Sequence, residues 1–139
     1  MKPLSDPRNR FIFVAALGLA SVMSAPNTYA ASAAELLTGY TAQAGVPAAA
    51  DRGQQFFTSR HGQEWSCSSC HGAVPTQTGK HAATGKTIGV FAPAFNPERF
   101  TDTAKVEKWF RRNCNDVVGR QCSASEKADM LAWLLTLKP

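Results

Sequence analysis

The residues with the clearest chemistry in this chain are two cysteines followed by a histidine, in the run Cys67-Ser68-Ser69-Cys70-His71. The two thiols are offset by about one helical turn, so both can reach the vinyl groups on one edge of a porphyrin. The histidine can then turn its imidazole beneath the iron as the proximal ligand. The spacing therefore predicts one covalently attached haem c, bound through Cys67 and Cys70 and ligated by His71.

Two other uses of a Cys-x-x-Cys pair fit the sequence less well. A structural zinc site needs a second pair of ligands at similar spacing, whereas Cys114 and Cys122 are eight positions apart. A thioredoxin-like redox pair belongs to a βαβ unit, and the strand-like apolar runs of such a unit are not found. We therefore favour haem over both alternatives.

The first 33 residues have the pattern of a secretory signal peptide. Three cations, Lys2, Arg8 and Arg10, precede an uncharged apolar stretch at 11–22, and small residues follow it. This stretch is too short for a membrane span, so an uncleaved anchor is the weaker alternative. The sequence predicts cleavage near residues 30–33, a single domain at 34–139, and a periplasmic protein without a stable membrane anchor.

Export also bears on charge and on the remaining cysteines. Loss of residues 1–33 removes three cations and one carboxylate, so the formal net charge falls from +5 to +3. The remaining cations are scattered rather than clustered, which argues against nucleic-acid binding. An oxidising compartment favours disulfides, and Cys114 and Cys122 are the pair left over once the haem cysteines are assigned. We expect them to be bonded.

The segments that must position these residues are mostly helical. Apolar residues at helical spacing predict four helices, at 34–44, 48–58, 103–113 and 123–137. Glycines and prolines recur through residues 72–100, which predicts a long irregular segment that packs on the cofactor. The fold class is therefore all-α. We expect Gly53 and Phe57 to lie where the second helix crosses the last one, near Trp133.

The third helix carries a polar residue on its apolar face. Val106, Trp109, Phe110 and Asn113 occur at i, i+3, i+4 and i+7 and so share one face. Trp109 and Phe110 are candidates for packing on the haem, with simple core filling as the alternative. The Asn113 amide is a candidate iron ligand, with an ordinary helix C-terminal asparagine as the alternative.

The sixth ligand of the iron is restricted by what the sequence lacks. Beyond the signal peptide the one methionine is Met130, which lies within the last helix. His81 and His61 are the histidine candidates. Methionine or histidine would give a plain six-coordinate electron carrier. An amide is a weak, hard donor that would hold ferric iron and leave on reduction, which would open a position for O₂ or NO.

The chain resembles the SHP-type cytochromes c, which are high-spin, oxygen-binding members of class I. The resemblance rests mainly on the segment from Phe100-Thr101-Asp102 to Cys122, including Arg112-Asn113-Cys114-Asn115 and Gly119-Arg120. It implies a small class I cytochrome c fold, Asn113 as the distal ligand and a Cys114–Cys122 disulfide. It also implies electron delivery from a dihaem cytochrome c, often alongside a membrane cytochrome b.

Together these features predict a periplasmic monohaem cytochrome in electron transfer, whose ferrous haem binds O₂, NO or a similar small ligand. One alternative is the plain carrier with His81 or Met130 as sixth ligand. Another is a small haem enzyme that reduces an oxygen or nitrogen species, although no distal acid–base pair can be assigned. A haem sensor that acts through a partner is a further alternative. We favour the electron-transfer and ligand-binding protein over an enzyme.

Overall fold

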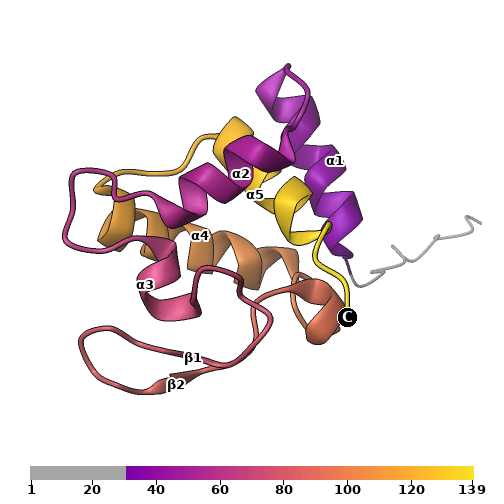
Figure 1. Ribbon diagram of the computed structural model, residues 1–139. Coiled ribbons are helices and arrows are strands. Elements are labelled where there is room, and N and C mark those ends of the chain that lie inside the picture. Colours follow the sequence, from indigo (N-terminus) through magenta and orange to yellow (C-terminus); the bar gives the residue numbers. More distant parts are fainter. Residues whose placement is uncertain (1–30) are drawn as a thin grey trace, which may run out of the picture.

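The computed structural model describes residues 31–139, so nearly all of the predicted signal peptide lies outside the described residues. Five α-helices account for most of the regular structure in this range, which confirms the all-α prediction (Figure 1). The helices are α1 (Ala33–Ala44), α2 (Ala50–Thr58), α3 (Cys67–His71), α4 (Thr103–Val118) and α5 (Ala124–Leu134). Between α3 and α4 lie a short antiparallel hairpin, β1 (Gly79–Lys80) and β2 (Thr87–Ile88), and the 3₁₀ helix η1 (Pro93–Phe95).

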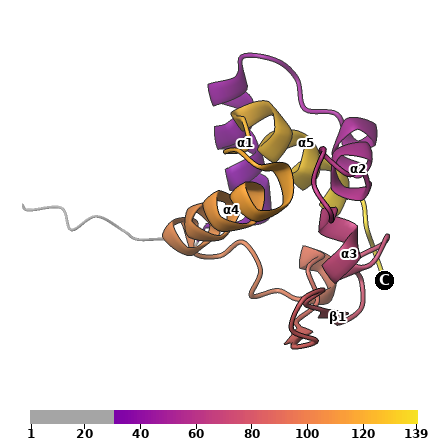
Figure 2. The ribbon, with the colours of Figure 1, turned by 90° about the vertical axis from the view of Figure 1, so that its left-hand side faces the viewer.

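The centre of the fold is the crossing of α2 and α5. A Cβ atom on Gly53 would overlap the backbone carbonyl of Asp129, so the two helices can approach this closely only with glycine there. One turn later the ring of Phe57 is fully buried, with its centroid 5.0 Å from that of Trp133. The predicted crossing of these helices is confirmed. In Figures 1 and 2, α1 packs beside α5 on the same side of the molecule.

A buried carboxylate fixes the connection between α1 and α2. Asp129 of α5 is almost fully buried, and its side chain accepts hydrogen bonds from Ala49 N at 2.7 Å and Arg52 Nε at 2.8 Å. Arg52 also donates to the carbonyl oxygen of Pro47. A buried carboxylate is costly unless it is paired, and here every partner comes from the start of α2 or the loop before it.

α4 is joined to α1 and α5 through one carboxylate. Glu107 accepts hydrogen bonds from the hydroxyl of Tyr40 at 2.5 Å and from Lys127 Nζ at 2.8 Å. The same ammonium lies 5.1 Å from the centroid of the Tyr40 ring and 5.3 Å from that of Phe110. This cluster of Tyr40, Glu107 and Lys127 holds three helices together at one point.

The sequence prediction for α4 needs two corrections. The helix does not end at residue 113 but continues to Val118, and the left-handed Gly119 (φ 74°) caps it. Its buried residues are Val106, Phe110, Cys114 and Val118, spaced four apart. The buried stripe therefore includes Cys114 and Val118, which the prediction left out, while Trp109 and Asn113 lie beside it and are exposed. The prediction missed these two residues because it ended the helix at residue 113.

The segment between α3 and α4 is largely irregular, as predicted, except for the hairpin. Gly79 pairs with Ile88 and Lys80 with Thr87. Figure 1 shows the hairpin lying beneath α3. In Figure 2 the helices α3 and α4 lie on different sides of the molecule. No helix within residues 31–139 is both long and apolar enough to cross a membrane.

Candidate haem site

The attachment motif forms a helix of its own. Cys67 and Cys70 lie on α3 three positions apart, and both are free thiols rather than a disulfide. The turn that opens α3 is fixed locally, because Ser66 N donates to Ser69 Oγ at 3.0 Å. Burial raises the pKa of Cys67 to about 11, so this thiol is protonated at neutral pH. Two thiols on adjacent positions of one helical face are the arrangement that a porphyrin edge requires.

The hairpin packs directly on this motif. Ala82 N donates to the Sγ of Cys70 at 3.2 Å. A Cβ atom on Gly79 would overlap the carbonyl oxygen of Cys70, so glycine is needed for β1 to lie this close to α3. The sequence shows turn residues in this region but not their contact with α3. This supporting role of residues 79–88 was therefore missed.

His71 lies against two aromatic rings that also contact each other. Its ring stacks on Phe91, with centroids 4.7 Å apart and planes 27° apart, and lies 6.1 Å from the ring of Phe57. Burial, helped by the positive charge of Arg99, lowers the pKa of His71 to about 4. The imidazole is therefore neutral at neutral pH, and a neutral imidazole nitrogen is what a metal needs as a donor.

The donor set fits haem c better than the two alternatives. Residues 31–139 contain no group of three or more His, Cys, Asp and Glu side chains that could hold a metal ion, as a zinc site would require. Strands in this range are limited to the two-residue pair of the hairpin, so no βαβ redox unit is present there. Two thiols and one adjacent neutral imidazole remain, which is the set that haem c uses.

Asn113 lies in the middle of α4, and its side chain is exposed. Since the helix continues for more than a turn beyond it, the ordinary explanation as a helix-ending asparagine does not hold. Trp109, one turn earlier, is 42% exposed and has the guanidinium of Arg112 5.7 Å from its ring centroid. These two side chains lie together on one flank of α4.

Phe110 has a different environment from Trp109. It is buried, and its ring meets that of Tyr40 edge-on at 5.8 Å. This contact between α1 and α4 is the core-filling role that the sequence left open for Phe110. Trp109 is the member of the pair with a surface left to pack on a cofactor.

A disulfide joins Cys114 of α4 to Cys122, which lies just before α5. Both cysteines are buried, and their Cα atoms are 5.6 Å apart. The bond fixes the backbone immediately after Asn113 and agrees with the pairing expected from the sequence. It connects the second half of α4 to the start of α5.

The other proposed sixth ligands are engaged elsewhere. Met130 is 4% exposed and packs in the core. The Nδ1 of His81 accepts from Thr84 N at 3.3 Å within the hairpin, which packs on α3 itself. The Nε2 of His61 lies 2.8 Å from the carbonyl oxygen of Phe56. Each of these side chains has a structural role where it stands.

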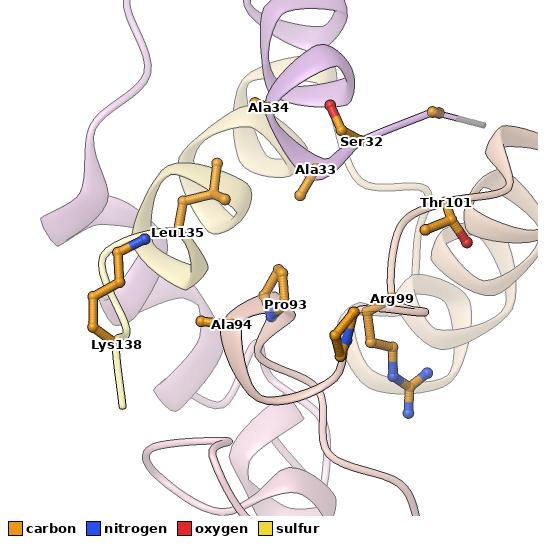
Figure 3. A pocket seen from close by; sticks show the side chains of 11 residues that line it. Ser32, Ala33, Ala34, Pro93, Ala94, Arg99, Thr101, Leu135 and Lys138 are labelled. Carbon is orange, nitrogen blue, oxygen red and sulfur yellow. The ribbon is translucent and has the colours of Figure 1, made fainter. Parts of the chain in front are cut away.

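A shallow hollow lies away from these residues, where the start of α1, η1 and the C-terminal segment meet (Figure 3). Its lining is mainly small and apolar, and includes Ala33, Pro93 and Leu135. None of the cysteines, His71 or Asn113 contributes to it. The hollow is therefore not part of the candidate haem site.

Comparison with known proteins agrees with the chemistry of the motif. A family model described as a domain of unknown function, DUF1924, matches residues 43–134. The chain is 48% identical over 129 residues to the cytochrome c-type protein SHP of Cereibacter sphaeroides, covering 90% of this chain and 96% of that protein. The chain belongs to the SHP family of c-type cytochromes. As a member of this family it is a monohaem cytochrome that carries covalently bound haem c.

Solved structures of SHP-like cytochromes share the fold. A structure of oxidised SHP, described as an oxygen-binding cytochrome c, is similar with a TM-score of 0.71 and 51% identity, covering 76% of this chain and 96% of that one. A solution structure of cytochrome c'' from Methylophilus methylotrophus has a TM-score of 0.67 and 39% identity, covering 77% and 94%. That structure is described as giving insight into haem-ligand detachment.

Proposed function

We propose that this cytochrome takes part in electron transfer and binds O₂, NO or a similar small ligand in its ferrous state, after Asn113 has left the iron. When bound, haem c supplies an iron that changes between ferric and ferrous states and accepts a diatomic ligand at an open position. Support comes from the similarity to an oxygen-binding cytochrome and to one whose haem ligand detaches.

On the proximal side we assign covalent attachment to Cys67 and Cys70 and iron ligation to His71. The support is the geometry of α3, with two free thiols one turn apart and a neutral imidazole stacked on Phe91. The stacking restricts rotation of the imidazole. The hairpin contact at Cys70 holds α3 in place beside it.

On the distal side we assign the labile ligand to Asn113. The observation that carries this assignment is the position of Asn113 in mid-helix, exposed, with the backbone after it fixed by the disulfide at Cys114. Its amide oxygen is a hard donor suited to ferric iron, and ferrous iron, with lower charge, retains it less well. Once released, the amide NH₂ can donate a hydrogen bond to an incoming ligand.

We also propose that the protein is exported to the periplasm and cleaved after Ala30. A disulfide is expected in an oxidising compartment, and Cys114–Cys122 supports that location. Ser32 caps α1 by accepting from Glu35 N, and Ala33 is buried, so cleavage after residue 33 would remove the cap.

A dihaem cytochrome c and a membrane cytochrome b remain the proposed redox partners, as the family resemblance implies.

The assignment of Asn113 is tested by comparing Asn113→Ala with Asn115→Ala. Both residues are exposed on α4, and Asn115 accepts a hydrogen bond from Gln121. We expect the ferric spectrum of Asn113→Ala to become that of an iron without its amide ligand, and its rate of cyanide binding to rise at least tenfold. Asn115→Ala should match the parent protein. An unchanged ferric spectrum in Asn113→Ala would contradict the assignment and point to a plain six-coordinate carrier.

A further inference from the structure

Arg99 lies in the loop after the hairpin, where several contacts fix its guanidinium. Nε donates to the carbonyl oxygen of Val90 and Nη2 to that of Gly89, both at 2.8 Å. The guanidinium carbon lies 5.7 Å from the centroid of the Phe91 ring. Arg99 also lines one edge of the hollow in Figure 3, with its guanidinium directed away from Pro93 and Leu135. The cation is therefore held against this loop rather than free in solvent.

The charge of Arg99 has no carboxylate partner within residues 31–139. Arg52, Arg112 and Arg120 each form a salt bridge, and the two other arginines in this range without one, Arg60 and Arg111, are exposed. A guanidinium carries five N–H donors, of which two are used by the backbone here. Burial lowers the pKa of Arg99, but a guanidinium stays charged at any physiological pH. A half-buried, permanent cation without a counter-charge is unusual and needs a reason.

Arg99 is connected to the proximal histidine through one ring. Phe91 lies under the guanidinium, and the same ring stacks on His71 at 4.7 Å. Arg99 is the one Lys or Arg in the sequence between Lys86 and Lys105. Its position beside Phe91 becomes visible only in the structure, because it depends on the path of the loop.

We propose that Arg99 is a charge-tuning residue that raises the reduction potential of the haem from the His71 side. This inference rests on His71 being the proximal ligand, as in the proposed function. The ferric haem carries one more positive charge than the ferrous haem, so a fixed cation nearby destabilises the ferric state more. Half-burial reduces screening by salt, so the effect of Arg99 exceeds that of an exposed arginine.

The test is the midpoint potential of the purified haem protein, measured by spectroelectrochemical titration. Arg99→Gln and Arg99→Met remove the charge, and the second keeps an aliphatic stem against Phe91. Arg99→Lys keeps the charge, and Arg60→Gln removes a charge from an exposed arginine as the matched control. We expect the potential to fall in both neutral variants, to stay near the parent value in Arg99→Lys, and to change less in Arg60→Gln.

Axial-ligand spectra distinguish charge tuning from a structural role. In the neutral variants we expect parent-like ferric and ferrous spectra together with the lower potential. A parent-like potential in either neutral variant that folds would overturn the proposal. Loss of the spectrum of a histidine-ligated haem in both Arg99→Gln and Arg99→Met would also overturn it, because Arg99 would then have a structural role. Gas binding by the ferrous parent protein is measured separately. Its absence would count against the labile Asn113 while leaving the comparison of potentials intact.

Discussion

The two sides of the candidate haem site are built in different ways. α3 carries its three functional residues within one five-residue helix, and the hairpin next along the chain supports it. α4 carries Asn113 in the middle of a sixteen-residue helix that is anchored far from its own sequence, to α1, α5 and the loop before α5. A local motif suffices for a permanent attachment. Under the proposed function Asn113 binds and leaves the iron, which requires a helix that stays still while one side chain moves.

The anchors of α4 are placed on both sides of Asn113. The cluster of Tyr40, Glu107 and Lys127 holds the helix nearly two turns before it, and the disulfide holds it at the next residue. Backbone motion is therefore restricted, and the exposed amide is the part that can move. On the α3 side the imidazole itself is restricted by its contacts with the rings of Phe91 and Phe57. This difference predicts that substitutions on the two sides have different effects, on haem attachment for α3 and on the ferric spectrum for α4.

The largest expected effect is removal of the covalent attachment. In the double variant Cys67→Ala/Cys70→Ala we expect complete loss of covalently bound haem, because no other free cysteine exists in residues 31–139. Acidified organic solvent extracts haem that is not covalently bound, so the measurement is the haem left on the protein after extraction. A variant that retains its haem through this treatment would contradict the assignment of α3.

Breaking the disulfide tests the distal side. The bond spans eight positions, and the loop-entropy model gives about 2–3 kcal/mol for a loop of this size. We expect Cys114→Ser/Cys122→Ser to lose roughly that much free energy of unfolding, measured by denaturant titration of the holoprotein. Its ferric spectrum should show a weaker Asn113 bond, while haem attachment is complete. A normal ferric spectrum would mean that the disulfide does not position Asn113.

The hairpin contact tests the proximal side in the same way. Gly79→Ala places a methyl group against the carbonyl of Cys70, and we expect it to lower the free energy of unfolding by roughly 1–3 kcal/mol. Gly39→Ala is the matched control, since a Cβ there meets nothing within 4 Å and α1 should gain about 0.5–1 kcal/mol. Equal stability of the two variants would contradict the claim that packing of the hairpin on Cys70 stabilises α3.

The smallest expected effect is a pH dependence from Glu107. Burial raises the pKa of Glu107, but hydrogen bonds from Lys127 and Tyr40 outweigh it and leave the pKa below its usual value. A lowered pKa means that Glu107 stabilises the fold at neutral pH and that this contribution is lost as the pH falls through the folded-state pKa.

Since the Glu107 side chain is 45% exposed, screening by solvent limits its contribution to about 1 kcal/mol or less. We expect Glu107→Gln to be less stable than the parent at pH 7 and to approach it at acid pH, in unfolding titrations at several pH values. Glu98→Gln, an exposed carboxylate in the loop, is the control and should follow the parent curve. Parallel curves for Glu107→Gln and the parent would contradict the role of the cluster.

Much of this fold follows from the sequence because its signals are local. Helical spacing located α1, α2 and α5 to within a few residues, and the glycine at 53 predicted the close crossing with α5. The predicted end of α4 was wrong because the apolar residues up to Asn113 already form a full helical face, so nothing in the pattern required the helix to continue. Only burial of Cys114 and Val118 against other elements shows that the stripe continues.

The candidate site shows the same difference between residues fixed by local sequence signals and residues placed by contacts between distant segments. The residues of α3 were predictable since thiols and imidazole are adjacent in the chain. The role of Gly79 and the placement of Arg99 beside Phe91 depend on how the loop at 72–102 folds back on α3. Spacing in a segment rich in glycine and proline carries no information about such a path.

The most direct test of the central claim is the optical spectrum of the purified haem protein, first oxidised, then reduced without oxygen, then exposed to O₂ or NO. We expect a six-coordinate ferric form that becomes high-spin and five-coordinate on reduction and whose spectrum then changes with the added gas. A reduced form that stays low-spin and does not respond to gas would contradict a labile Asn113.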